Sequence, residues 1–289
     1  MIIIFFLILI ILIIVLIYFC SQPNDKIIVA GCAWNCGKYA DAVFDNIKKI
    51  TQLYNDYLII IAYDKSDDDT LEKLKNHQMI HGNKMILILG EKKSKIRTEN
   101  LCVARTKILL EIKRQYMIQK FQHFIIMDLD DVSIGPLKIN VLRHFLKKNN
   151  EHWDALSFNR KKYYDIWALS YDPFIISLFH WKKVERLFIQ HDIENRLKKT
   201  PLLRCYSAFN GFCIYRAGVF IHSFYDWRVG NNLKFLSDQM IVNNKKAFPT
   251  ENELVLKDEM DCEHRHYHFY AHFHLGARIM ISSQSIFDG

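Results

Sequence analysis

The chain has 289 residues, of which half are hydrophobic, and its 39 basic and 31 acidic side chains give a formal net charge of +8. Seven cysteines are too few for a disulfide-rich scaffold in a chain of this length. The lysines are scattered and form no basic stripe interleaved with aromatic residues, so we expect no nucleic-acid partner. They indicate a solvated surface, with weak attraction to anionic groups as the alternative.

Residues 1–19 contain no charged side chain and almost no polar one. About eighteen apolar residues in succession are enough to span a bilayer. The segment has neither the basic start nor the small-residue cleavage site of a secretory signal peptide. We therefore interpret residues 1–19 as a retained transmembrane signal-anchor and residues 20–25 as a linker, with the rest of the chain on one side of the membrane. The flanking charges do not fix the orientation, because Asp25 and Lys26 cancel.

Four apolar runs follow the linker and alternate with stretches of helical character. The expected strands are residues 26–31, 57–63, 84–89 and 124–127, and the expected helices are residues 37–50, 71–76 and 98–115. Strands that are apolar throughout and alternate with helices are typical of βαβ units in a parallel sheet that is covered on both faces. The sequence therefore predicts an α/β fold.

The fourth apolar run ends at three acids, Asp128, Asp130 and Asp131. Side chains of an extended chain repeat every two residues, so Asp128 and Asp130 can point the same way at the carboxyl end of the strand. That edge is where open α/β sheets bind ligands. With no basic residue beside them in the sequence, the two carboxylates repel each other unless a cation lies between them, and hard divalent cations prefer oxygen ligands. The motif predicts a site for a metal–diphosphate, with a solvated turn as the alternative, and Asp131 is expected to cap the turn.

The second half of the chain shows a less regular pattern of expected helices and strands. Residues 136–148 are expected to be helical and residues 153–158 to form a strand, whereas residues 159–210 show no clean periodicity. A turn feeds a strand within residues 208–216, a short helix starts at residues 237–239, and residues 245–260 are expected to form a loop. A helix over residues 263–275, ended by Gly276, and a strand over residues 278–282 complete the chain.

Five motifs, taken in order, resemble one class of enzymes. They are Arg97-Thr98-Glu99-Asn100-Leu101 with Ala104-Arg105, the Asp-X-Asp at residues 128–130, Tyr163-Tyr164-Asp165-Ile166-Trp167-Ala168-Leu169, Phe209-Asn210-Gly211-Phe212, and Cys262-Glu263-His264 followed by Tyr267-His268 and Gly276-Ala277-Arg278-Ile279. The second and the last are similar to nucleotide-sugar-dependent glycosyltransferases of the A-type fold. The last resembles the family-2 arrangement of an acidic pair, a helix, a glycine and a strand. The others resemble segments of the fungal capsule-associated α-1,3-mannosyltransferase family and related giant-virus enzymes, and the likeness covers roughly residues 26–285.

The resemblance implies the A-type glycosyltransferase fold, in which a Rossmann-like, mostly parallel central sheet is flanked by helices. It divides a domain over residues 26–289 into a nucleotide-binding half over residues 26–131 and an acceptor-binding half over residues 132–289. It implies a metal-dependent hexosyltransferase that moves a sugar from a UDP- or GDP-sugar to a glycan or glycoprotein acceptor. Together with the anchor, it implies a single-pass type II membrane protein whose catalytic domain is lumenal, as in the ER or Golgi, or lies on a virus-associated membrane.

The metal site is assigned by the same resemblance. Asp128 and Asp130 are expected to hold the ion directly or through water. A third ligand is usual, and His268 or His264 is expected to supply it. Mn²⁺ tolerates mixed oxygen and imidazole ligands, so it is the first choice and Mg²⁺ the second. The other histidines of residues 264–274 are expected to be packed or solvated, because the segment contains no His-Glu-X-X-His zinc motif.

Four residues are expected to bind the nucleotide sugar. Arg97 and Arg105 are candidates for the diphosphate, because a guanidinium group matches phosphate geometry. A surface salt bridge is the alternative for Arg105. Asp165 and Trp167 are expected to line the sugar pocket, and a core position is the alternative for the tryptophan.

An inverting reaction needs a carboxylate that takes the proton of the acceptor hydroxyl. Glu263 matches the first acid of the family-2 pair and is the candidate base, with Asp238 in reserve. His264 stands where the second acid is expected and is assigned to the acceptor side, with Asn210 and Gly211. The alternatives are a helix-dipole role for the glutamate, a tight turn at residues 210–211, and a retaining reaction that needs no base.

Two other functions remain open from the sequence. Residues 128–132 also fit the first motif of haloacid-dehalogenase-type phosphatases, but that motif normally lies on the first core strand and is followed by a later acidic pair. The other alternative is a membrane-anchored sugar-binding module that has lost turnover, which His264 in place of an acid favours.

Overall fold

The computed structural model describes residues 24–91, 94–147, 152–176, 183–247 and 260–287. The expected membrane segment over residues 1–19 lies outside these ranges, as do residues 20–23 of the linker and most of the expected loop over residues 245–260. Within the described ranges, no helix combines the length and the apolar character that a bilayer crossing requires.

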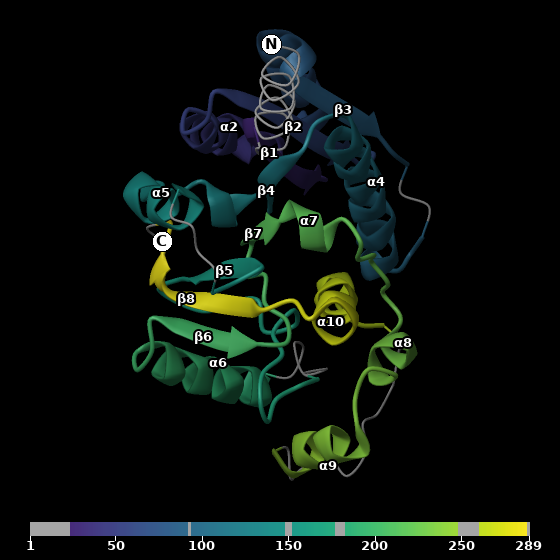
Figure 1. Cartoon of the computed structure of the whole chain (residues 1–289). Helices are drawn as coiled ribbons and strands as arrows, with labels where there is room; N and C mark the ends of the chain where they lie inside the picture. Colours follow the sequence, from purple (N-terminus) through teal and green to yellow (C-terminus); the bar gives the residue numbers. More distant parts are fainter. Residues whose placement is uncertain (1–23, 92–93, 148–151, 177–182, 248–259, 288–289) are drawn as a thin grey trace, which may run out of the picture.

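One sheet of eight strands runs through the described ranges (Figure 1). The strands are β1 (Asn24–Ala33), β2 (Asp56–Tyr63), β3 (Met85–Leu89), β4 (Phe121–Met127), β5 (Ala155–Asn159), β6 (Leu202–Cys205), β7 (Phe212–Arg216) and β8 (Ile279–Ser285). Their order is β3-β2-β1-β4-β7-β5-β8-β6. The first four strands pair in parallel, whereas β7 runs antiparallel to both β4 and β5. β8 is parallel to β5 and antiparallel to β6, so the sheet is Rossmann-like in its first half and mixed in its second.

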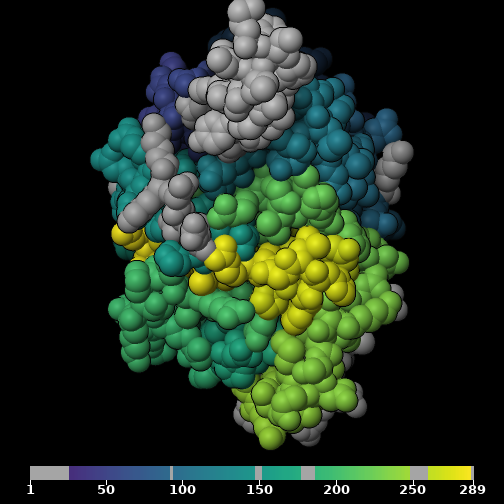
Figure 2. All heavy atoms as spheres, in the orientation of Figure 1, coloured from purple at the N-terminus to yellow at the C-terminus, as the bar shows by residue number. Residues whose placement is uncertain are grey.

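Helices cover both faces of the sheet (Figure 1). They are α2 (Gly37–Thr51), α3 (Thr70–His81), α4 (Arg97–Ile118), α5 (Ile139–Lys147), α6 (Lys183–Leu197), α7 (Ala217–Phe220), α8 (Val229–Leu233), α9 (Asp238–Ala247) and α10 (Glu263–Leu275). In the space-filling view, α10 and β8, coloured yellow, lie between the N-terminal half of the chain and the segment that carries α8 and α9 (Figure 2).

The side chains of β1 show why its apolar run predicts a buried strand. Ile28 and Ala30 belong to the hydrophobic core shared with α4, whereas Ile27 and Val29 belong to the core shared with α2. Successive side chains of a strand point to opposite faces. A strand that is covered on both faces is therefore apolar at every position, and its sequence shows a continuous run rather than alternation.

The carboxyl ends of β1, β2 and β4 meet at one edge of the sheet, and β7 begins there because it runs antiparallel. The backbone N–H of Asp128 donates to the carbonyl of Gly211 over 2.9 Å and ties the end of β4 to the turn before β7. Asn210 and Gly211 adopt left-handed backbone angles in this turn, with φ of 51° and 80°. The fold thus gathers the acidic motif and the Asn-Gly turn at the edge where α/β sheets bind ligands.

Most expected elements are confirmed where the structure describes them. The helix expected over residues 263–275 coincides with α10, and Gly276 ends it with a left-handed φ of 68°. The four expected parallel strands are present, and α3 and α4 run a few residues further than expected. Residues 159–210, whose sequence shows no clean periodicity, contain α6 and β6.

Candidate active site

A cavity of about 590 Å³ lies at this edge of the sheet. Its wall combines the end of β1, the residues that follow β4, the first turns of α4, part of the loop after β5 and the start of α10. It contains eight of the residues that the sequence assigns to the site, namely Arg97, Arg105, Asp128, Asp130, Asp165, Trp167, Glu263 and His264. Segments that are far apart in the chain therefore meet in one cavity.

The two carboxylates of the acidic motif have different environments. Asp128 accepts a hydrogen bond from the Tyr164 hydroxyl at 3.0 Å and one from Arg105 at 3.4 Å. Burial and the neighbouring Asp128 carboxylate raise the pKa of Asp130 to about 7. Two carboxylates that both line the cavity supply the oxygen ligands that hard divalent cations prefer, so these two residues fit such an ion.

Asp130, rather than Asp131, caps the turn after β4. The side chain of Asp130 accepts from the backbone N–H of Val132 at 3.3 Å, at the start of the short helical turn Asp131–Ser133. Asp131 is exposed and lines the cavity mouth. The expected capping role of Asp131 is therefore wrong, because the cap comes from the residue immediately before the turn.

Arg105 supplies the positive charge that the sequence around the acidic motif lacks. Its side chain, which is 6% exposed, projects from α4 and forms an ion pair with Glu263 at the start of α10. It also contacts the Asp128 carboxylate and lies over the Phe209 ring, 5.1 Å from its centre. The alternative of a surface salt bridge is wrong, because this pair is buried in the cavity wall.

The other residues that are predicted to bind the nucleotide sugar lie at the mouth and in the wall of the cavity. Arg97 is the first residue of α4 and is exposed. Trp167 is 8% exposed and lines the cavity. Asp165 accepts backbone hydrogen bonds from Ala168 at 3.2 Å and Asn210 at 3.3 Å. Burial, followed by the Asp128 charge, raises the pKa of Asp165 to about 6.

His264 is buried in the wall of the cavity next to Glu263. Its ring stacks on Phe209 with 3.8 Å between ring centres. Neither of its ring nitrogens has a hydrogen-bond partner among the described residues. Burial and the positive charge of Arg105 lower the pKa of His264 well below its ordinary value, so the ring is neutral. A buried imidazole without partners is suited to hydrogen-bond a polar ligand in the cavity.

Two of the predicted site residues do not reach the cavity. His268 is fully buried, and its ring nitrogens are bonded to the hydroxyls of Ser207 and Tyr215, each at 2.9 Å. It therefore has no nitrogen available for a metal, and the assignment of His268 as third ligand is corrected. Asp238 is exposed at the start of α9 and does not line the cavity. Its assignment as the reserve base is therefore corrected. Among the described residues, no group of three or more His, Cys, Asp or Glu side chains is arranged to hold a metal.

Asn210 and Gly211 position the cavity wall instead of contacting an acceptor directly. Asn210 is 1% exposed, and its side-chain oxygen accepts from the backbone N–H groups of Tyr164 and Asp165, each at 3.3 Å. A Cβ on Gly211 would lie 2.6 Å from the Tyr164 hydroxyl, so this position requires glycine. Together they hold Tyr164 against Asp128, and the direct acceptor role predicted for them is corrected.

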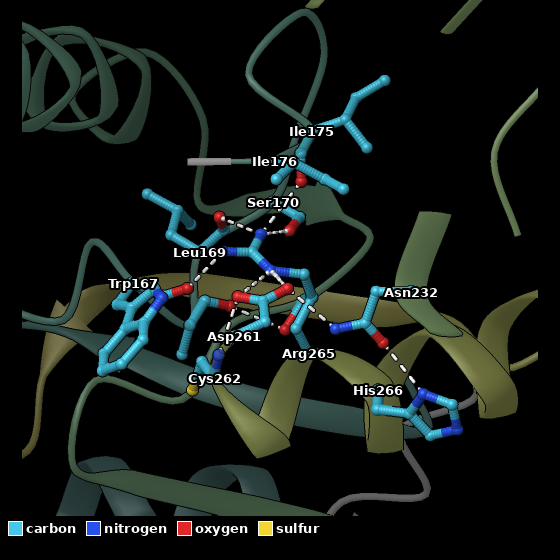
Figure 3. Close-up of polar contacts among 12 residues, drawn as sticks. Trp167, Leu169, Ser170, Ile175, Ile176, Asn232, Asp261, Cys262, Arg265 and His266 are labelled. Carbon is cyan, nitrogen blue, oxygen red and sulfur yellow. Dashed lines mark hydrogen bonds and ion pairs between the residues drawn. The ribbon is translucent and has the colours of Figure 1, made fainter. Parts of the chain in front are cut away.

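A buried network fixes the first turn of α10 (Figure 3). Arg265 is fully buried and pairs with Asp261 at 2.8 Å. It also donates to the carbonyls of Leu169 at 3.1 Å and Ile175 at 2.9 Å and to that of Trp167. The network ties the start of α10 to the loop that carries Trp167 and thereby sets where Glu263 lies. Asp261 and Arg265 are not among the predicted site residues, because their i,i+4 spacing is their only local signal.

Sequence reasoning also left Tyr164 and Arg160 without roles. Tyr164 holds Asp128, and it lies in a motif that the resemblance quotes. Arg160 donates to the carbonyls of Val132 at 2.6 Å and Asn210 at 3.0 Å, which joins the acidic turn to the Asn-Gly turn. Nothing in the sequence near Arg160 marks it, because both of its partners are distant in the chain.

No family model matches the chain, and no curated protein does. Among solved structures, the chain is similar to residues 1-349 of S. aureus TarS in complex with UDP-GlcNAc, with 14% identity, a TM-score of 0.43 and coverage of 91% of this chain and 57% of that one. It is also similar to glucosyl-3-phosphoglycerate synthase from Mycobacterium tuberculosis in complex with Mg²⁺ and UDP, with 13% identity, a TM-score of 0.37 and coverage of 68% and 58%. The chain thus spans less than two thirds of the length of these structures.

Proposed function

We propose that the chain is a metal-dependent glycosyltransferase that moves a sugar, a hexose by the resemblance of its motifs, from a UDP- or GDP-sugar to a glycan or glycoprotein. The observation that carries this proposal is the cavity at the carboxyl edge of the sheet, in which Asp128 and Asp130 converge beside Arg97 and Arg105. Paired carboxylates suit a divalent cation, and guanidinium groups suit phosphates. The resemblance of the five sequence motifs supports the A-type fold and the sugar donor.

The acidic motif, its tyrosine and arginine neighbours and Glu263 each have a role in this reaction. Asp128 and Asp130 would hold Mn²⁺ or Mg²⁺, which when bound neutralises charge on the departing diphosphate. Tyr164 orients Asp128, and Arg97 at the mouth meets the diphosphate. Glu263 is the proposed proton acceptor for the acceptor hydroxyl, and its ion pair with Arg105 fixes it in the cavity wall.

The remaining wall residues bind the sugar in this proposal. Trp167 presents apolar surface to the sugar ring, and Asp165 accepts hydrogen bonds from sugar hydroxyls. His264 offers a neutral ring with both nitrogens free of protein partners in the described residues. It stands where the resembling family has an acid, and a neutral hydrogen-bonding group there is compatible with substrate binding.

The first prediction concerns nucleotide release. The full chain in detergent micelles is incubated with a panel of UDP- and GDP-sugars and Mn²⁺, and we expect release of nucleoside diphosphate that EDTA abolishes and Mn²⁺ restores. The expectation follows from the two carboxylates, which repel each other without a cation. Release of phosphate from phosphomonoesters instead would support the phosphatase, and nucleotide binding without release would support the sugar-binding module.

We also propose that residues 1–19 anchor the chain in a membrane, with the catalytic domain lumenal or on a virus-associated membrane. The most exposed large apolar side chains of the described residues support this: Met79 (75%), Ile80 (76%), Met117 (76%) and Ile118 (68%). They lie at the C-terminal ends of α3 and α4. Because β1 and β4 run parallel, with Asn24 opposite Phe121, the end of α4 is beside Asn24, the first described residue of β1.

The second prediction tests this anchor. The full chain is expected to stay in the membrane pellet after alkaline carbonate extraction. Replacing Leu9 and Ile13 by Arg should release it, because a charged residue at the centre of a span costs about 2.5–3.5 kcal/mol. Val242→Arg on exposed α9 is the matched control and should stay in the pellet. Release of the unmodified chain would contradict the anchor.

A further inference from the structure

A second cavity adjoins the candidate active site. Its volume is about 730 Å³, and Asp131 and Tyr164 line both cavities. Tyr164 is the residue whose hydroxyl holds Asp128, so the shared wall lies beside the acidic motif. In a sugar transfer, the acceptor must approach the donor from a neighbouring space, and this cavity is such a space.

The second cavity carries a cluster of cationic side chains. Arg160, Lys161 and Lys162 follow one another along its lining, and both lysines are exposed. The carboxylates of the lining are Asp131, at the shared wall, and Glu194, which accepts from the backbone N–H of Tyr163 at 3.3 Å. The lining therefore presents two ammonium groups and one guanidinium group to a ligand, with Asp131 and Glu194 as its carboxylates.

The guanidinium group of Arg160 is held in place so that it can bind an anionic ligand. Two of its guanidinium nitrogens donate to the carbonyls of Val132 and Asn210, and the group lies over the Phe287 ring, 5.1 Å from its centre. Its third nitrogen, Nη2, is buried and has no hydrogen-bond partner among the described residues. A guanidinium donor that is buried without an acceptor is costly unless a ligand supplies one, and a planar oxyanion is its best match.

We propose that the second cavity binds the acceptor of the sugar transfer and that this acceptor carries an anionic group, a phosphate or a carboxylate. The inference rests on the proposed function and specifies its acceptor class. The anion meets Arg160, Lys161 and Lys162, and the acceptor hydroxyl points toward the shared wall at Tyr164. The hydroxyl oxygen then forms a bond to the anomeric carbon as the bond from that carbon to the diphosphate oxygen breaks. The nucleoside diphosphate leaves with the electron pair, and the hydroxyl proton passes to a cavity carboxylate.

The test measures the binding of glucose 6-phosphate, glucuronic acid and glucose to the full chain in detergent by calorimetry, without nucleotide. We expect one or both anionic probes to bind more tightly than glucose, and which of them does distinguishes phosphate from carboxylate. The double substitution Lys161→Gln with Lys162→Gln should lower the affinity for the more tightly bound anion at least about tenfold, because charge-assisted hydrogen bonds are lost. Lys245→Gln with Lys246→Gln on α9 removes the same charge from exposed positions outside both cavities and should change affinity less than about twofold.

The inference is overturned if glucose binds as tightly as both anions, or if the two double variants weaken binding equally, which indicates bulk charge alone. Nucleotide release by the unmodified chain is measured separately, in the assay of the first prediction. Failure of the proposed function would show as no nucleotide release from any donor. That outcome is independent of whether the lysine pair changes anion binding.

Discussion

Replacing Asp130 by Asn is expected to abolish the proposed nucleotide release and, when no divalent cation is present, to stabilise the fold. Asn keeps an oxygen that can accept from the Val132 N–H but cannot hold a cation as a carboxylate does. Nucleotide release should fall at least about 10²-fold, the loss typical of removing one electrostatic contact to the reacting group. The stabilising effect follows from the pKa of Asp130, which burial and Asp128 raise to about 7.

The size of this stability effect depends on pH. A carboxyl whose folded-state pKa lies above its ordinary value contributes stability that is fully present below that ordinary value and is lost as the pH rises through the folded pKa. The Asp130→Asn variant has no such loss. It should therefore match the unmodified protein near pH 4 and exceed it by about 1–3 kcal/mol at pH 8 in EDTA, a figure that allows for partial exposure of the side chain.

Urea unfolding of the full chain at pH 4, 6 and 8 in EDTA measures this difference, and Mn²⁺ titration adds a second readout. The cation should stabilise the unmodified protein and leave Asp130→Asn nearly unchanged. Asp131→Asn removes the same charge from the exposed neighbour and should shift stability by less than about 0.5 kcal/mol. Equal stabilisation by both substitutions, or full activity of Asp130→Asn, would refute the assignment of the cation site.

The first half of the fold could be predicted because its signals are local. Each of β1, β2 and β4 is buried on both faces, so its sequence is a continuous apolar run. In contrast, the part of α6 whose burial is described, residues 186–197, buries Ile189, Ile193 and Leu197 at four-residue spacing on a helix that mixes charged and apolar side chains. This four-residue spacing is hidden among the charged and aromatic residues around it, which is why the sequence of the segment shows no clean periodicity.

Many residues of the site could be predicted from the sequence, but which of them contact each other could not. Asp128 and Asp130 follow from strand periodicity, whereas the contact between Arg105 and Glu263 joins two helices through the fold. His264 and His268 do share one helix face, as their i,i+4 spacing predicts, with 5.8 Å between ring centres. The first turn of α10 borders the cavity and the next turn lies in the core. Of the two rings, the His264 ring therefore lines the cavity and the His268 ring does not.

Replacing Arg105 by Met should be among the most destabilising single changes in the chain. It leaves the carboxylate of Glu263, a residue that is 1% exposed, without its partner. Breaking a buried ion pair from one side costs about 3–5 kcal/mol, because the remaining charge stays buried. Glu263→Gln should cost less, because Arg105 keeps its contact with Asp128 at 3.4 Å.

Combining the two substitutions should recover at least about 1 kcal/mol of the Arg105→Met loss, because the double variant buries no unpaired charge. Arg114→Met, on the same helix, removes an exposed partner of Glu111 and should change stability by less than about 1 kcal/mol. Urea unfolding of the four proteins gives the coupling energy. Additive effects would show that Arg105 and Glu263 do not depend on each other for stability.

The same variants separate a catalytic from a structural role of Glu263. If its carboxylate takes the acceptor proton, Glu263→Gln should lower turnover about 10²-fold or more while nucleotide affinity stays nearly unchanged. Arg105→Met should weaken nucleotide affinity as well, because it removes the positive charge beside Asp128. Normal turnover of Glu263→Gln would leave the glutamate as the partner that holds Arg105 in the cavity wall. The base would then be sought at Asp165, whose pKa of about 6 and place in the cavity suit proton transfer near neutral pH.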